Sequence, residues 1–247
     1  FVDAHYNMGI ILQGQGQLEE AIVSYNKALS LNPDYAEVHN NMGIVLKDQG
    51  QLEEAIVSYN KAVSLNPNYA EAHNNMGIVL KDQGQLAEAM VSFEKALSLN
   101  PNYAEAYNNM GNLLQELSKL EEAIVSYNKA VSLNPNYAEA YNNIGMVLGG
   151  QGQLVEALVS FDKAVSINPN FGNAHYNMGI ILRDQGKLVE AIVSYNKAVS
   201  LNPNYAEAYN NIGVVLQDQG KLDEALVSYN KAVSLSPNYA EAYNNIG

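Results

Sequence analysis

Apolar positions along the chain fall into pairs of stripes with helical spacing. In residues 70–103, two successive stretches place apolar side chains at i, i+3, i+4 and i+7, which is the spacing of one face of a helix. Gly84 lies between the stretches, and glycine adopts the left-handed backbone of a turn at low cost. The pattern therefore predicts two helices folded into a hairpin. The first stripe contains Ala72, His73, Met76, Gly77, Val79 and Leu80, and the second contains Leu86, Ala89, Met90, Phe93, Ala96 and Leu97.

The hairpin pattern returns every 34 residues. A constant period of this length predicts a solenoid, in which each repeat buries its apolar face against the next. The prolines that mark the period are Pro33, Pro67, Pro101, Pro135, Pro169, Pro203 and Pro237. One array then accounts for residues 1–247, with repeats at 2–35, 36–69, 70–103, 104–137, 138–171, 172–205 and 206–239 and a partial repeat at 240–247.

The junction between repeats carries signals that stop one helix and start the next. Pro101 cannot continue the preceding helix, because it lacks an N–H and its ring clashes with the turn behind it. Asn102 stands three residues before Glu105, in a variant of the capping box. We therefore expect the Asn102 side chain to cap the next helix.

Each expected first helix contains a glycine, as at Gly43, Gly77 and Gly111. Glycine inside a helix costs about 0.5–1 kcal/mol relative to alanine, so a packing contact must compensate. We expect the paired helix to approach closely here, against small residues such as Ala55 or Ala89.

These features resemble the tetratricopeptide repeat. The 34-residue hairpin with an internal glycine, Ala89, Phe93, Ala96 and Pro101 matches its motif, which recurs seven times in register and begins an eighth. The resemblance covers the whole chain. It implies an all-α, right-handed solenoid superhelix that serves as a noncatalytic protein-interaction scaffold. Where the family often has tryptophan, this chain has His5, His39, His73 and His175, and elsewhere Tyr107, Tyr141, Tyr209 and Tyr243.

Charge and composition narrow the classes of partner. The 26 acidic residues against 13 basic ones give a net charge of −13, which repels nucleic-acid phosphates. No apolar stretch approaches the length needed to cross a bilayer, so we expect no membrane partner. The chain has no cysteine and begins at Phe1 without a signal-like segment, so the cytoplasm is only the default expectation.

The sequence offers no set of residues for catalysis, metal binding or a cofactor. The four histidines are separated by full repeats and lie on packed stripes, which predicts structural roles rather than metal ligation. Acidic pairs such as Glu53-Glu54 open second helices and suit the positive end of the helix dipole. Gly149-Gly150 follows a helix and lacks the strand and lysine of a phosphate loop, so we expect a frayed helix end or a hinge there.

Paired asparagines are the candidate binding residues. Asparagine is a mediocre helix former, yet the second member of a pair stands mid-helix in every repeat. The resemblance implies that first helices line a concave groove, where amides could donate to and accept from the main chain of an extended peptide. The candidates are Asn7, Asn41, Asn75, Asn109, Asn143, Asn177, Asn211 and Asn245, joined by Asn74, Asn108, Asn142 and Asn112.

Other interpretations of the asparagines stay open. They could cap, bridge adjacent repeats or keep the surface soluble, and tandem duplication would copy a neutral choice. Duplication is visible, because the eight residues that begin at His5 recur unchanged at His175. Irregular positions such as Leu117-Ser118, Gly149-Gly150 and Gly172-Asn173 could add selectivity for a partner. They could also reflect sequence drift that the array tolerates.

Three further functions follow from the resemblance and the pattern. A basic clamp for a terminal carboxylate is disfavoured, because Asn40, Asn74 and Asn108 stand where the clamp has lysine. The asparagine ladder resembles the substrate-binding arm of O-GlcNAc transferases, so the chain could be a substrate-recruiting fragment of such an enzyme. The half-hairpin at 240–247 leaves an apolar end uncovered, which predicts end-to-end self-association as a third alternative.

Overall fold

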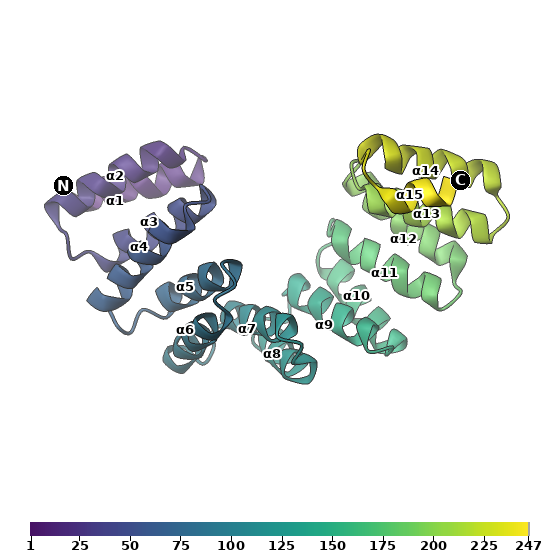
Figure 1. Ribbon diagram of the computed structural model, residues 1–247. Helices are drawn as coiled ribbons and strands as arrows, with labels where there is room; N and C mark the ends of the chain where they lie inside the picture. Colours follow the sequence, from purple (N-terminus) through teal and green to yellow (C-terminus); the bar gives the residue numbers. More distant parts are fainter. Residues whose placement is uncertain (247) are drawn as a thin grey trace. The chain divides into compact units, whose positions relative to one another are not determined.

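The computed structural model describes residues 1–246, and these contain fifteen helices and no strand (Figure 1). Gly247, the last residue of the expected partial repeat, lies outside the described residues. The first helices of the repeats are α1 (Val2–Gly14), α3 (Ala36–Asp48), α5 (Ala70–Asp82), α7 (Ala104–Glu116), α9 (Ala138–Gly150), α11 (Gly172–Asp184), α13 (Ala206–Asp218) and α15 (Ala240–Ile246). The second helices are α2 (Leu18–Leu31), α4 (Leu52–Leu65), α6 (Leu86–Leu99), α8 (Leu120–Leu133), α10 (Leu154–Ile167), α12 (Leu188–Leu201) and α14 (Leu222–Leu235). The expected all-α hairpin fold is confirmed.

A tight turn joins the two helices of each hairpin. In the third repeat, Gly84 has φ +74°, and the N–H of Gln85 donates 2.9 Å to the carbonyl of Leu80. This left-handed residue lets the chain reverse direction while it satisfies a carbonyl at the end of α5. Ser118 occupies the same place in the fourth repeat with φ 58°, a conformation that disfavours a side chain.

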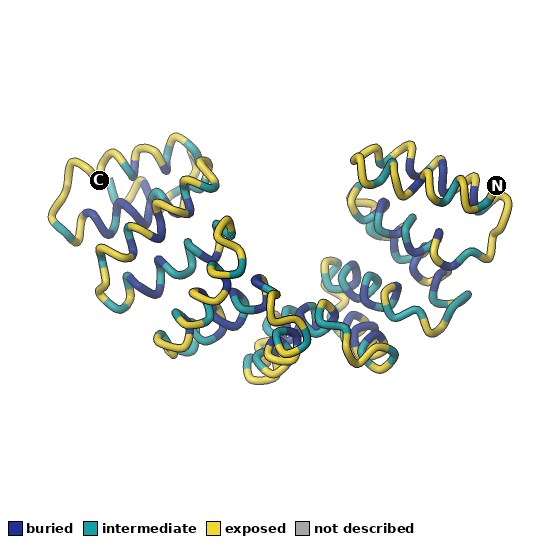
Figure 2. The backbone as a smooth tube through the Cα atoms, turned by 180° about the vertical axis from the view of Figure 1, so that it is seen from behind, coloured by how far each residue is buried: buried dark blue, intermediate teal, exposed yellow. Residues whose placement is uncertain are grey.

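The chain divides into two compact units, and each is described by itself. Unit 1 contains α1 to α8, and unit 2 contains α9 to α15. Within each unit, the first helices of successive repeats contact one another, and each second helix packs against the first helix of its own and the next repeat. Buried residues lie on the helix faces that meet these neighbours, while the opposite faces are exposed (Figure 2).

An aromatic ring covers the mid-helix glycine in each first helix from α1 to α13. A Cβ added to Gly77 would lie 2.7 Å from Cε1 of Phe93, and one added to Gly43 would lie 2.7 Å from Cε1 of Tyr59. The close approach expected at these glycines is therefore present, but an aromatic side chain makes it rather than Ala55 or Ala89. The missing Cβ lets the ring approach the helix backbone closely, and those dispersion contacts offset the poor helix propensity of glycine.

The repeat junctions differ from the expected capping box. Helix α7 begins at Ala104 after Tyr103, and no side chain donates to or accepts from its first turn as a cap. Instead, Oδ1 of Asn100 accepts a 3.1 Å hydrogen bond from the backbone N–H of Asn102. The prediction for Asn102 was wrong, because an asparagine before Pro101 bends the chain through a local turn of its own.

Helix α9 continues through both glycines that suggested a hinge. It runs from Ala138 to Gly150, the same length of 13 residues as α7 and α11. Gly152 then takes the positive φ of +76° that ends the first helix in other repeats. The expectation of a frayed end at Gly149-Gly150 was therefore wrong, since both residues are helical, and a local hinge there stays a prediction.

Candidate functional site

Within each unit, second asparagines bridge successive first helices. In unit 1, Asn75 Nδ2 donates to Oδ1 of Asn40 at 3.1 Å, and Asn109 Nδ2 donates to Oδ1 of Asn74 at 3.1 Å. In each case the donor and the acceptor are 35 residues apart, which is one repeat plus one residue. The amides therefore connect α3 to α5 and α5 to α7.

Unit 2 has the same bridges. Asn177 Nδ2 donates to Oδ1 of Asn142 at 3.0 Å, and Asn245 Nδ2 donates to Oδ1 of Asn210 at 3.0 Å. Bridging between adjacent repeats was one of the alternatives left open by the sequence, and the structure contains it in both units.

Tyrosine replaces the first asparagine in two repeats and keeps the bridge. Asn41 Nδ2 donates to the hydroxyl of Tyr6 at 3.2 Å in unit 1, and Asn211 Nδ2 donates to the hydroxyl of Tyr176 at 3.1 Å in unit 2. The phenol oxygen thus supplies the acceptor that an amide oxygen supplies elsewhere. This substitution indicates that a hydrogen-bond acceptor is needed at the position, whichever side chain carries it.

The two asparagines of a pair differ in exposure. The first members are buried, with Asn74 at 0%, Asn108 at 6% and Asn142 at 5% exposure. A peptide on the surface cannot touch Asn74 unless the helices move, so burial disfavours the direct peptide contact expected of these three. Among the second members, Asn7 is exposed, Asn211 is buried at 9% exposure, and the other six are half-buried on the first helices: Asn41, Asn75, Asn109, Asn143, Asn177 and Asn245.

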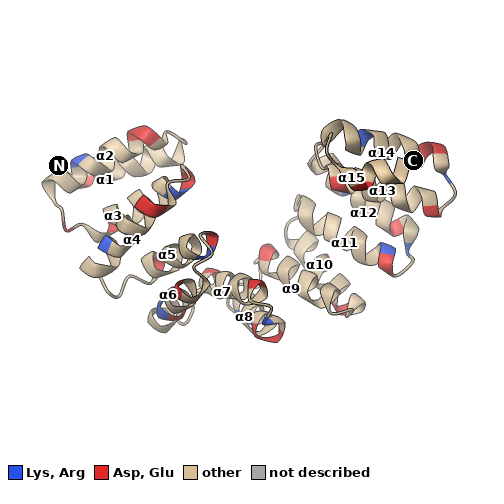
Figure 3. Cartoon of the chain, in the orientation of Figure 1, with Lys and Arg blue, Asp and Glu red and all other residues tan. Residues whose placement is uncertain are grey.

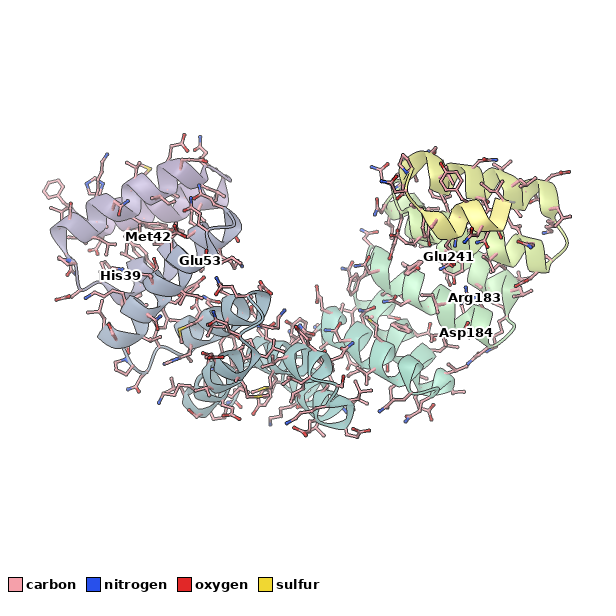
Figure 4. All side chains as sticks on the ribbon, viewed as in Figure 1. His39, Met42, Glu53, Arg183, Asp184 and Glu241 are labelled. Carbon is pink, nitrogen blue, oxygen red and sulfur yellow. The ribbon has the colours of Figure 1, made fainter. Side chains whose placement is uncertain are left out.

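A glutamate completes the bridge in one repeat of each unit. Asn40 Nδ2 donates to Glu71 Oε1 at 3.4 Å, and Asn210 Nδ2 donates to Glu241 Oε1 at 3.3 Å. Glu241 lies on α15 beside α13 (Figure 4). Nδ2 of Asn74 is buried without a hydrogen-bond partner among the described residues. The third repeat therefore carries the free-energy cost of a buried donor without a partner, which the second repeat avoids.

Asn112 is bound within its own repeat. It is half-buried on α7, and its Oδ1 accepts a 2.8 Å hydrogen bond from the hydroxyl of Tyr127. Burial raises the pKa of the Tyr127 hydroxyl, which therefore remains a donor at neutral pH. Asn112 thus satisfies a buried tyrosine, a role that differs from the inter-repeat bridges.

Buried tyrosines of the second helices pair with glutamines of the first helices. This pairing was not predicted, although in three repeats a glutamine precedes the tyrosine by twelve residues in the sequence. Where Lys47 or Arg183 replaces the glutamine, the hydroxyls of Tyr59 and Tyr195 are buried without a partner among the described residues. The hydroxyl of Tyr25 donates to Oε1 of Gln13 (2.8 Å) and that of Tyr229 to Oε1 of Gln217 (2.7 Å), while the single proton of the Tyr127 hydroxyl is shared between Oδ1 of Asn112 and Oε1 of Gln115 (3.0 Å).

Basic side chains near the asparagines are paired with the next residue in the chain. Lys81 Nζ lies 2.9 Å from Asp82 Oδ1, and Arg183 Nη2 lies 3.2 Å from Asp184 Oδ1. Charged residues are scattered over both units without a basic cluster in the view of Figure 3. The described residues contain no group of three His, Cys, Asp or Glu side chains able to hold a metal ion, and none of their helices is long and apolar enough to cross a membrane.

Comparison with known families decides the class of this array. The family model described as a TPR repeat matches residues 11–50, 45–84, 79–118, 111–152 and 179–220. Models described as tetratricopeptide repeat match residues 138–171, 206–239 and 160–193. The chain belongs to the tetratricopeptide repeat family. Its repeats are the unit of a protein–protein interaction scaffold, which is the general function that this family membership supports.

Solved tetratricopeptide repeat structures are similar to this chain. YrrB, described as a TPR protein with an unusual peptide-binding site, is 27% identical with a TM-score of 0.61 over 75% of this chain and 96% of YrrB. MamA is 26% identical with a TM-score of 0.61 over 67% of this chain and 97% of MamA. A chain of the APC/C hetero-tetramer Cut9-Hcn1, at 18% identity and a TM-score of 0.82 over 95% of this chain and 46% of that chain, shows the fold alone. A comparison with curated protein sequences found no match.

Three of the four histidines in this tetratricopeptide repeat array bind the backbone at repeat junctions. His39 Nε2 lies 2.9 Å from the carbonyl oxygen of Pro33, and His73 Nε2 lies 3.2 Å from that of Pro67. In unit 2, His175 repeats the contact with Pro169 at 3.1 Å. Because a carbonyl only accepts, Nε2 is the donor. These contacts agree with the structural role expected of the histidines, and burial lowers the pKa of His73.

Proposed function

We propose that the half-buried second asparagines hold the main chain of an extended peptide, and that the array is a noncatalytic scaffold for such segments. Asn75, Asn109 and Asn177 support the proposal. Each donates one Nδ2 hydrogen to the preceding repeat, and its Oδ1 accepts no hydrogen bond from the described residues. Each carboxamide therefore retains one donor and one acceptor, the two groups that a peptide unit complements.

The spacing of the asparagines suits an extended guest. Packed helices lie about 8–10 Å apart, and an extended peptide rises roughly 3.3 Å per residue. One asparagine would therefore meet about every third residue of the peptide. The inter-repeat bonds add to this fit, because they fix each amide before the ligand arrives and so reduce the entropy lost on binding.

Energetics predict weak binding with little sequence preference. A net hydrogen bond contributes about 0.5–1.5 kcal/mol, whereas ordering a peptide residue costs roughly 1–2 kcal/mol. Two hydrogen bonds for every three peptide residues contribute about as much free energy as the ordering of those residues costs. Useful affinity therefore requires many repeats or side-chain contacts. YrrB, an array similar to this one, is described as having a peptide-binding site. That site is a property of YrrB, and it supports the proposal that the groove of this chain binds a peptide.

A titration with a labelled twelve-residue peptide of alternating Ser and Lys tests the proposal. The variant Asn75→Ala, Asn109→Ala, Asn143→Ala removes three second asparagines, and we expect at least about tenfold weaker binding. The matched control is Asn60→Ala, Asn128→Ala, Asn196→Ala, which removes three exposed asparagines from second helices. Circular dichroism establishes that both variants fold. Equal affinity of the two variants would remove the asparagines from the mechanism.

A further inference from the structure

A cavity of about 290 Å³ opens between α9, α10 and α11 of unit 2, beside one of the bridging asparagines. Met146, Ile180 and Ile181 contribute apolar wall, and Met146 is itself 44% exposed. Asn177 lies at the same cavity and donates its Nδ2 to Asn142. An apolar hollow is therefore directly adjacent to a carboxamide that retains a free acceptor.

The hollow lies beside two glycines. Gly149 and Gly150 line it, at the positions where the second and third repeats have Lys47-Asp48 and Lys81-Asp82. A Cβ added to Gly150 would meet no atom within 4 Å, so the space above it is open. Helix α9 keeps its full length despite both glycines. The chain thus omits two side chains without a change in the helix. The space beside Gly150 is open, whereas a Cβ added to Gly149 would lie 2.7 Å from Cδ1 of Ile181, which packs against that glycine.

The cavity is also lined by less polar residues than stand at the same positions in other repeats. Phe161 lines it, whereas the corresponding residue in five other repeats is a tyrosine. The lysine or arginine that stands twelve residues before that ring in three other repeats is replaced by Gly149. Asp184 is the charged lining residue, and Arg183 neutralises it at 3.2 Å (Figure 4). Neither a hydroxyl nor a net charge is therefore available inside, which disfavours a polar or charged occupant.

We propose that this cavity binds one apolar side chain, of the size of leucine or methionine, from an extended peptide whose main chain contacts Asn177. The inference rests on the proposed peptide function and adds a side-chain preference to it. Sites of this volume with apolar walls and few polar groups are typical of small apolar ligands. Burial of the side chain supplies the affinity that main-chain hydrogen bonds alone lack.

The charge around the cavity specifies the residues that flank the apolar anchor. Residues 134–247 contain ten Asp and Glu against six Lys and Arg. Asp218 stands one repeat after Asp184, is exposed, and forms no ion pair with the described residues. Successive helices are about 8–10 Å apart, a distance spanned by roughly three extended peptide residues. A lysine or arginine three residues from the anchor would therefore face Asp218.

The test uses the peptide Ac-Lys-Gly-Ser-Leu-Ser-Gly-Lys-NH2, in which a lysine lies three residues from leucine in either direction. Methyl NMR follows its titration into the full chain, and we expect shifts at Met146, Ile180 and Ile181, with Met42 of unit 1 as a reference. Replacement of the leucine by alanine should weaken binding at least about tenfold, because most of the buried apolar area is lost. Replacement of both lysines by glutamate should also weaken it.

Gly150→Leu fills the cavity, and Gly14→Leu is its matched control. Both glycines end a first helix, and a Cβ added at either would meet no atom within 4 Å. Leucine is the better helix former, so neither variant should melt below the wild type. We expect Gly150→Leu to lose at least about tenfold in affinity and Gly14→Leu to bind as the wild type does.

Each outcome separates this inference from the proposed function. If the leucine and alanine peptides bind equally, or if Gly150→Leu binds as tightly as the wild type, the cavity is not the anchor site. The proposed function would still stand if the triple asparagine variant lost affinity for the peptide. Shifts confined to methyl groups outside the cavity would also overturn the inference. Absence of any peptide binding would overturn both.

Discussion

Asn75 donates a 3.1 Å hydrogen bond from Nδ2 to Oδ1 of Asn40, across the boundary between two repeats. This bond explains why a mediocre helix former stands in the middle of α5. The buried oxygen of Asn40 needs a donor, and Asn75 supplies it from the next first helix. The same side chain keeps a donor and an acceptor at the surface, so one residue can serve packing and ligand binding together.

The hydrogen bonds between repeats predict that alanine substitution of two buried asparagines destabilises the fold by different amounts. Asn40→Ala removes the acceptor of Asn75 and the donor to Glu71, and we expect a loss of about 1–3 kcal/mol in the free energy of unfolding. Asn74→Ala also removes an acceptor, but it eliminates a buried Nδ2 that has no partner among the described residues. The loss should therefore be smaller. Urea unfolding compares the two, and a larger loss for Asn74→Ala would contradict this account.

Removal of a buried tyrosine hydroxyl should have opposite effects in two repeats. Tyr127→Phe removes the hydroxyl whose proton is shared by Asn112 and Gln115, so we expect a loss of about 1–2 kcal/mol. Tyr59→Phe removes a hydroxyl without a partner among the described residues and should be neutral or stabilising. Thermal melting of the two variants checks the difference. Equal destabilisation would mean that the Tyr59 hydroxyl is satisfied in solution.

Ser118→Gly should stabilise the fourth repeat. Ser118 has φ 58°, whereas the glycines at the same place in other repeats have φ between +74° and +77°. Relief of this backbone conformation is worth roughly 0.5–1 kcal/mol. The reverse substitution Gly84→Ser is the matched control and should destabilise by a similar amount. A lower melting temperature for Ser118→Gly would refute the prediction.

Buried tyrosines should make the fold sensitive to alkali. Burial raises the pKa of Tyr25 to about 12, from an ordinary value of 10.0. Below pH 10 the hydroxyl is protonated in both states, so its contribution to stability is complete. Between pH 10 and 12 the unfolded chain loses the proton first, and stability falls as pH rises. Urea midpoints at about pH 9, 10 and 11 measure the decline, and Tyr25→Phe should make it shallower. An identical slope in this variant would exclude Tyr25 as a cause.

Local sequence determined the repeat and its hairpin. The apolar spacing in residues 70–103, the proline at Pro101 and the left-handed Gly84 each act within a few residues of the chain. Such properties are fixed by backbone geometry, so the sequence alone predicted the helices, their period and the family. Inference from local sequence also predicted the wrong cap at Asn102. Two turns were possible there, and the asparagine before the proline forms the one observed.

Tertiary structure decided what the polar side chains do. The positions of Asn74 and Asn75 were evident in the sequence, but their unequal burial depends on the distance and rotation between α3, α5 and α7. The ring of Phe93 on Gly77 and the hollow above Gly150 likewise depend on how one helix rests on another. Helical periodicity gives the direction in which a side chain points from the axis of its own helix. Only the packed array determines which atom, 35 residues away, lies within hydrogen-bond reach.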